Sequence, residues 1–190
     1  MIKIESSLSD DVYDKNTIML HWLSAALVAG LWLVGQSIDF FPKGTPRVTV
    51  RSLHIVAGLM LAVVLVMRLA WRRQGGVKLP AADPGVAGKL AVGVHHLLYM
   101  LLALVVLAGI ANVWVRGDTL FGLFKVPTFD PTNKGLRKLV GELHSLGANT
   151  LFAIAGAHAA MAVWHHLALK DSVLRRMLPR LAKAPNRTRP

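Results

Sequence analysis

Four long apolar segments constrain the fold of this 190-residue chain more than any other feature. Each can cross a hydrocarbon layer of about 30 Å, which requires roughly 20 residues of α-helix. Because backbone groups in lipid must satisfy their own hydrogen bonds, we expect four helices packed in a bundle. The expected spans are Thr17–Ile38, Val50–Trp71, Leu90–Val115 and His144–Leu169. The sequence therefore predicts an all-α, multi-pass membrane protein whose first partner is the lipid bilayer.

The composition supports one small membrane domain. Hydrophobic residues make up 54% of the chain and charged residues 17%, and no cysteine occurs. The absence of cysteine excludes disulfides, thiolate-held iron–sulfur clusters and covalently attached c-type haem. We expect an N-terminal tail over residues 1–16, a transmembrane domain over 17–169 and a basic tail over 170–190. No removable signal peptide is expected, because the polar start lacks a basic region followed by an apolar core.

The positions of Lys and Arg predict the orientation, because cytoplasmic loops carry an excess of both. The connection after the second span and the segment after the fourth are basic, so both termini are placed in the cytoplasm. The two outer loops are net basic as well, and no nucleic-acid partner is expected. Their basic residues are Lys43, Arg47, Arg51, Arg116, Lys125, Lys134, Arg137 and Lys138, against Asp39, Asp118, Asp130 and Glu142.

Four histidines lie inside these apolar segments at depths that match in pairs. His144 and His158 are fourteen residues apart, close to four helical turns, so they share one face about 21 Å apart along the axis. With spans running alternately inward and outward, His54 lies level with His144 toward the outside, and His21 with His158 toward the inside. Each pair is predicted to hold one haem iron from two axial sides, giving two haem b between the helices.

A flat porphyrin requires room beside each ligand, and each of the four histidines has a small residue three or four positions later, on the same helix face. Polar residues that hold helices together are the structural alternative. Metal or proton transport is disfavoured, because no Asp or Glu lies in the interior of a span. The neighbours are Ser24 and Ala25 for His21, Ala57 and Gly58 for His54, Gly147 and Ala148 for His144, and Met161 and Ala162 for His158.

Further polar residues lie near the inner ends of the spans. Arg68 and Arg72 are candidates to pair with a haem propionate, or to extend to the membrane interface as ordinary cations. His95 and His96 open the third span. They are candidates to bind a quinone carbonyl, to contact a propionate, to replace a proposed ligand or simply to pack at the interface.

Several short motifs, in their order and spacing, resemble the prokaryotic cytochrome b561 family, and within it the small di-haem members that oxidise superoxide. The resemblance implies that His21, His54, His144 and His158 are the axial iron ligands. It also implies ubiquinone as an electron acceptor in the bacterial inner membrane. The motifs are His21-Trp22-Leu23, Phe40-Phe41-Pro42, Leu53-His54 with Gly58 and Arg68, the His95–Tyr99 spacing, Arg116-Gly117, His144 to His158 to His165-His166, and Lys170-Asp171 to Arg176-Met177-Leu178-Pro179.

These expectations define an enzyme hypothesis, in which superoxide at the outer face provides electrons that pass through two b haems to ubiquinone. Cations attract an anionic substrate and raise its encounter rate; the candidates are Arg51, Arg116, Arg137 and Lys138, which alternatively bind lipid headgroups. A second hypothesis is a quinone-linked relay or anchor that exchanges electrons with a periplasmic redox protein. A third is a structural or transport bundle without haem.

Overall fold

The computed structural model describes residues 12–80 and 85–179 of the chain. In these residues lie four helices long and apolar enough to cross a membrane, which confirms the predicted fold class. A two-stranded antiparallel hairpin and a short helix accompany them. The elements are α2 (Lys15–Ser37) with the 3-10 turn η1 (Ile38–Phe40), α3 (Thr45–Gln74), α4 (Val86–Arg116), β1 (Thr119–Leu120), β2 (Phe124–Lys125), α5 (Lys134–Trp164) with the π-helical turn η2 (His165–Leu169), and α6 (Val173–Met177).

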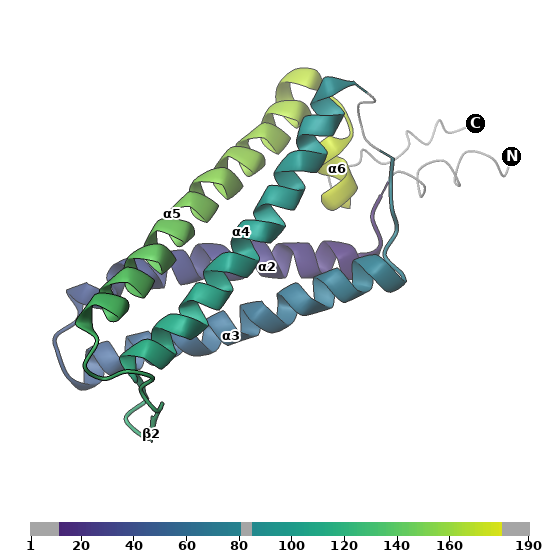
Figure 1. Cartoon of the computed structure of the whole chain (residues 1–190). Helices are drawn as coiled ribbons and strands as arrows, with labels where there is room; N and C mark the ends of the chain where they lie inside the picture. The colour runs from purple at the N-terminus through teal and green to yellow at the C-terminus, as the bar shows by residue number, and fades with distance from the viewer. Residues whose placement is uncertain (1–11, 81–84, 180–190) are drawn as a thin grey trace, which may run out of the picture.

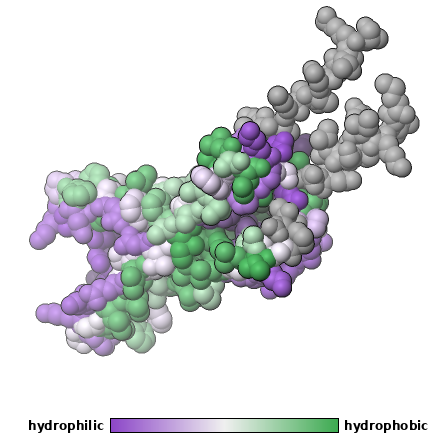
Figure 2. Space-filling view, turned by 90° about the horizontal axis from the view of Figure 1, so that it is seen from above, coloured by the Kyte–Doolittle hydropathy of each residue, from purple (hydrophilic) through white to green (hydrophobic). Residues whose placement is uncertain are grey.

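The long helices form two antiparallel pairs, α2 with α3 and α4 with α5 (Figure 1). The pairs converge at the end that carries β1 and β2, here called the hairpin end. They diverge toward the end where α6 lies, here called the α6 end (Figure 1). Figure 2 shows hydrophilic residues gathered toward the two ends, with apolar residues between them. This distribution is typical of helices surrounded by lipid.

A small leucine core joins the two pairs near the middle of the helices. It consists of Leu61 and Leu65 on α3, Leu102 on α4 and Leu151 on α5, each at most 6% exposed. Most other large apolar side chains of the spans point outward, as expected where lipid rather than water surrounds the protein. The leucine core therefore fixes how the pairs cross.

The observed helices extend beyond the predicted membrane-crossing spans, most of all at the starts of α5 and α3. Helix α5 begins at Lys134 instead of His144, because the Asn133 side chain caps it by accepting a hydrogen bond from Leu136 N at 2.9 Å. Helix α3 begins at Thr45 with a proline in its first turn. Hydropathy marks the part of a helix that lies in lipid, whereas caps mark where the helix begins. The connection between α4 and α5 is therefore shorter than the predicted spans imply.

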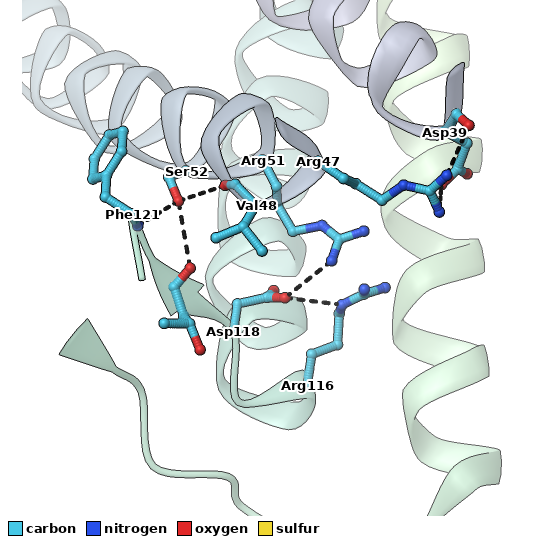
Figure 3. A network of polar contacts seen from close by, with 9 residues as sticks. Asp39, Arg47, Val48, Arg51, Ser52, Arg116, Asp118 and Phe121 are labelled. Carbon is cyan, nitrogen blue, oxygen red and sulfur yellow. Dashed lines mark hydrogen bonds and ion pairs between the residues drawn. The ribbon is translucent and has the colours of Figure 1, made fainter. Parts of the chain in front are cut away.

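The hairpin at the end of α4 is held against α3 by one buried hydroxyl. Gly117 ends α4 with φ of 64°, a left-handed conformation that favours glycine. Ser52, which is 0% exposed, accepts a hydrogen bond from Phe121 N at 2.8 Å and donates to Val48 O at 2.7 Å (Figure 3). The hairpin is thereby fixed two residues from His54.

Asp14 joins three segments at the α6 end. Its carboxylate caps α2 by accepting from Thr17 N at 2.9 Å, and it also accepts from Trp71 Nε1 on α3 at 2.9 Å and from Val77 N at 3.1 Å. Burial by itself raises the pKa of Asp14, but the hydrogen bonds from Thr17, Val77 and Trp71 outweigh it and hold the pKa well below its ordinary value of 3.8.

Helix α6 packs across the same end. Trp22 Nε1 on α2 donates to Met177 O at 2.9 Å, and Arg176 Nη1 donates to Pro80 O at 2.7 Å. Tyr13 N donates to Arg176 O at 3.2 Å. The segment expected as a basic tail therefore begins with a docked helix, while residues 1–11 and 180–190 of the two expected tails lie outside the described residues.

We predict that Asp14→Ala lowers the free energy of unfolding by about 1–2 kcal/mol at neutral pH, the usual effect of losing a helix cap. A carboxylate whose pKa is depressed in the folded state stabilises it above the unfolded pKa, and that contribution is lost as the pH falls toward the folded pKa. The difference between wild type and variant should therefore shrink below about pH 4. Thermal unfolding in mild detergent across pH measures it. A constant difference down to pH 3 would contradict the role of the carboxylate charge.

Candidate functional site

The structure brings the four predicted ligand histidines together as two pairs, at two levels of the bundle. The rings of His54 on α3 and His144 on α5 have centroids 6.1 Å apart and lie nearest the hairpin end. The rings of His21 on α2 and His158 on α5 have centroids 6.4 Å apart and lie toward the α6 end. All four side chains are partly buried. These are the pairs that the depths in the sequence predicted.

The spacing within each pair fits axial ligation of a haem iron. Two imidazoles on opposite sides of one metal ion, with metal–nitrogen bonds of about 2.0–2.1 Å, have ring centroids about 6 Å apart. Among the described residues, no group of three or more His, Cys, Asp or Glu could hold a metal ion unaided. A haem does not require one, because its macrocycle provides the equatorial ligands and the protein provides the axial ones.

Glycines leave space for the imidazole rings of the pair near the hairpin end. A Cβ on Gly35 would lie 3.2 Å from Cε1 of His54, and a Cβ on Gly109 would lie 3.0 Å from Cε1 of His144. One turn from His54, a Cβ on Gly58 would meet nothing within 4 Å. The two imidazoles are thus packed against bare backbone, and the helix face beside His54 has space for a flat group.

The orientation of His144 suits a metal ligand. Its Nδ1 lies 3.1 Å from the carbonyl oxygen of Val105 on α4. When Nδ1 carries the proton and donates it to this carbonyl, Nε2 keeps the lone pair that a metal requires.

The pair near the α6 end has charged and aromatic neighbours. Arg68 Nη2 lies 3.4 Å from His21 Nδ1, and the Arg68 guanidinium lies 5.0 Å from the centroid of the Tyr99 ring. The ring of His95 is 5.0 Å from that of His158, so His95 belongs to the same group.

The other two residues predicted near this level lie elsewhere. His96 Nδ1 lies 2.8 Å from Val92 O of its own helix, and no ring contact in the described part of the chain joins His96 to either pair. Arg72 lines a pocket with Leu69, Arg73 and Lys78. Neither residue contacts the four paired histidines in the described structure.

Carboxylates partly neutralise the cations predicted to steer an anion. Arg51 and Arg116 both pair with Asp118, at 3.5 Å and 3.4 Å (Figure 3). Lys138 lies 3.8 Å from Glu142. Arg137 has no carboxylate within 4 Å among the described residues, and its buried Nε has no hydrogen-bond partner there. Arg137 is therefore the predicted steering residue whose charge is least offset.

Two polar contacts in α5 and η2 were not predicted from the sequence. Asn149 Oδ1 accepts hydrogen bonds from Trp32 Nε1 at 2.9 Å and from Gln36 Nε2 at 3.0 Å, and so links α5 to α2. A polar residue within an apolar span generally has a partner on another helix, and this rule would have singled out Asn149. Which helix provides the partner depends on the crossing of the pairs, which periodicity does not give.

The second is a pair between His165 Nδ1 and Asp171 Oδ2, which closes the turn at the end of α5. Burial by itself raises the pKa of Asp171, but hydrogen bonds from His165 and Val173 N outweigh it and keep the pKa below its ordinary value of 3.8. The pair lies outside the two groups of imidazoles described above.

Known proteins resemble this chain over almost its whole length. Cytochrome b561 homolog 1 of Escherichia coli (strain K12) is 30% identical over 171 residues, covering 88% of this chain and 97% of that protein. A protein of Yersinia pestis named probable superoxide oxidase CybB is 29% identical over 167 residues, covering 86% and 93%. Cytochrome b562 of Cereibacter sphaeroides is 29% identical over 176 residues, covering 87% and 94%.

A sequence model of the family described as prokaryotic cytochrome b561 matches residues 12–180. The match includes all four long helices, α6 and both histidine pairs. The two imidazole pairs and the four apolar helices are what a haem-binding membrane bundle requires. The chain belongs to the prokaryotic cytochrome b561 family of membrane electron-transfer proteins.

Proposed function

We propose that this protein oxidises superoxide at the periplasmic face of the bacterial inner membrane and transfers the electrons to ubiquinone. The observation that carries the proposal is the placement of two imidazole pairs at two levels of the bundle, each with the spacing of axial iron ligands. Such an arrangement supports electron transfer between the two ends of the bundle. A single pair would place a redox centre near only one end of the bundle.

In this proposal His54 and His144 hold one b haem and His21 and His158 hold the other. When bound, the haems provide the one-electron centres that amino-acid side chains lack. The chain itself positions the ligands, since α5 carries one histidine of each pair. The buried leucine core of Leu61, Leu65, Leu102 and Leu151 lies between the two levels.

The reaction balances with two substrates at opposite faces. Each superoxide anion gives up one electron and leaves as dioxygen, and ubiquinone takes two electrons and two protons to become ubiquinol. Two superoxide anions are therefore consumed for each ubiquinone. In this proposal the α6 end and both termini lie in the cytoplasm and the hairpin end lies in the periplasm. The excess of Lys and Arg after α3 and α5 supports this orientation. His95, beside His158, is the candidate contact for ubiquinone.

Charge supports an anionic substrate at the hairpin end. Its loops and helix ends carry eight basic residues and four acidic ones, so a net positive potential remains after the pairing with Asp118 and Glu142. A cationic surface raises the local concentration of a small anion and its encounter rate. The name of the Yersinia pestis relative points to the same substrate.

A relay that receives electrons from a periplasmic redox protein is the second candidate function. The tip of the hairpin exposes apolar side chains, with Leu123 at 91% and Phe124 at 59%. Exposed apolar residues of this kind serve to contact a partner or a membrane surface. The names of the two cytochrome relatives specify no electron donor.

A direct test combines the purified protein in lipid nanodiscs with a superoxide source and a ubiquinone analogue. The proposal predicts haem reduction by superoxide, ubiquinol formation with the analogue present, and loss of both on adding superoxide dismutase. Haem that is reduced by ubiquinol yet inert to superoxide would contradict the proposal and favour the relay.

Substitution of single ligands tests the pairing. We predict that His54→Ala or His144→Ala removes one haem, about half of the total, and that His21→Ala or His158→Ala removes the other, because loss of an axial ligand weakens only its own site. Optical spectra and the haem content per chain measure this. The two variants of one pair should retain the same spectrum, different from that of the other pair. Equal loss of both haems in every variant would contradict the pairing.

The close approach of Gly109 to His144 gives a second test. In Gly109→Ala the new Cβ would lie 3.0 Å from Cε1 of His144. We predict weaker haem retention at the His54–His144 site. Gly93→Ala is the matched control, because it also replaces a glycine in α4 but meets nothing within 4 Å. Both changes favour the helix by up to about 1 kcal/mol, so a difference between them reports the imidazole contact. Equal haem content in the two variants would contradict this account.

Arg137 and Lys138 differ in how far a carboxylate offsets their charge, so substituting them should change the superoxide rate by different amounts. We expect Arg137→Gln to lower the rate severalfold at low ionic strength and much less at high ionic strength, where salt screens the long-range attraction between the protein and a dissolved anion. Lys138→Gln should have a smaller effect, because Glu142 offsets its charge. Stopped-flow measurement of haem reduction at several salt concentrations separates the two. A loss that is independent of salt would indicate direct contact rather than steering.

A further inference from the structure

We infer that Arg68 acts through His21 to raise the reduction potential of the redox centre at the α6 end above that of the centre at the hairpin end. The inference rests on the two-haem site proposed above. It gives the bundle a direction, because an electron then moves more favourably from the hairpin end to the α6 end than in reverse.

The position of Arg68 differs from that of an ordinary interfacial cation. Its Nη2 lies 3.4 Å from His21 Nδ1, and its guanidinium lies over the Tyr99 ring at 5.0 Å. The distance to Nδ1 exceeds the 2.7–3.2 Å typical of a strong hydrogen bond, so the contact acts mainly through charge. The aromatic face of Tyr99 favours a cation at this place without neutralising it.

No protein carboxylate in the described part of the chain compensates this charge. Among the described residues, none of the Asp or Glu side chains lies within 4.0 Å of Arg68. A guanidinium stays protonated at every physiological pH. A partly buried, permanent positive charge is thus held directly beside one ligand of the His21–His158 pair.

The pair near the hairpin end has a different electrostatic environment. Arg51, three residues before His54 in α3, pairs with Asp118 at 3.5 Å. The groups that contact these imidazoles include the uncharged Gly35, Gly109 and the carbonyl of Val105. A backbone carbonyl that accepts from Nδ1 places negative partial charge next to the ligand. The two pairs thus share their ligand type and differ in the charge beside it.

This difference in charge raises the reduction potential of one centre relative to the other. Reduction adds one negative charge to the centre, and a nearby uncompensated cation stabilises that charge most where the surroundings are poor in water. Hydrogen bonds and charges next to the axial ligands are a recognised means by which a protein tunes haem potentials. The centre held by His21 and His158 is therefore the stronger electron acceptor.

The test is a spectroelectrochemical titration of the full-length holoprotein, in wild type and in Arg68→Gln. We expect two waves in wild type, and a fall of the upper one in Arg68→Gln by at least tenfold in the equilibrium constant, about 59 mV for one electron. Arg72→Gln is the matched control, since it removes a cation one turn away that lines a surface pocket. It should shift neither wave by that amount. Arg68→Lys keeps the charge and should shift the upper wave less than Arg68→Gln does.

Three results would overturn the inference. The first two are an unchanged upper wave in Arg68→Gln and an equal shift in Arg72→Gln. The third needs no change at Arg68: if the wave that disappears in His21→Ala is the lower one, the order of the two centres is opposite to that inferred. This third measurement keeps the inference falsifiable even when Arg68→Gln does not fold or does not bind haem.

Failure of this inference is distinguishable from failure of the proposed function. The titration contains neither superoxide nor ubiquinone, so the order of the potentials is measured without either substrate. If the protein does not react with superoxide but its upper wave belongs to the His21 centre, the inference about Arg68 stands and the proposed substrate is wrong. If the protein oxidises superoxide but the two reduction potentials have the opposite order, the proposed function stands and the inferred role of Arg68 is wrong.

Discussion

The placement of two histidines on one face of α5 is the constraint on which the rest of the bundle depends. His144 and His158 are fourteen residues apart, and Leu151 lies midway between them in the sequence. The antiparallel α2 and α3 bring His21 and His54 to the same two levels. At the intermediate level, Leu151 packs with leucines of α3 and α4. The interior of the bundle is thus layered, with a polar pair, an apolar core and a second polar pair.

Much of this arrangement could be predicted from the sequence, because it depends on two features that the sequence shows directly, the length of the apolar segments and the spacing of the histidines. Apolar length fixes the number of spans, and a helical repeat of about 3.6 residues places His144 and His158 on one face. The alternation of span direction then gives the depths of His21 and His54. Features that depend on the crossing of the helix pairs could not be predicted. Examples are the contact of Asn149 with Trp32 and the sharing of Asp118 by two arginines.

The helix ends illustrate a second limit. Hydropathy placed the start of the fourth span at His144, ten residues after the helix begins at Lys134. Asn133 is a cap whose signal lies in a polar segment that a search for apolar length ignores. Asp14 is a comparable case, since an acidic residue directly before an apolar run is a recognisable helix start. Its additional bonds to Trp71 and Val77 follow only from the way the segments meet at the α6 end.

The two ends of the bundle use charge differently. At the hairpin end, Asp118 holds Arg51 and Arg116 together, so the charges there shape the loop as well as the potential outside it (Figure 3). At the α6 end, Arg68 lies against an aromatic ring and an imidazole without a carboxylate within reach in the described residues. A bundle whose two histidine pairs are equivalent by sequence pattern is made unequal by these neighbours.

The haem content of the purified chain tests the central claim most directly. Protein expressed with sufficient haem, purified in mild detergent and quantified against its polypeptide concentration, should contain two non-covalent b haems per chain, both low-spin with two axial imidazoles. A preparation saturated at one haem per chain, or a colourless one that remains folded, would contradict the account.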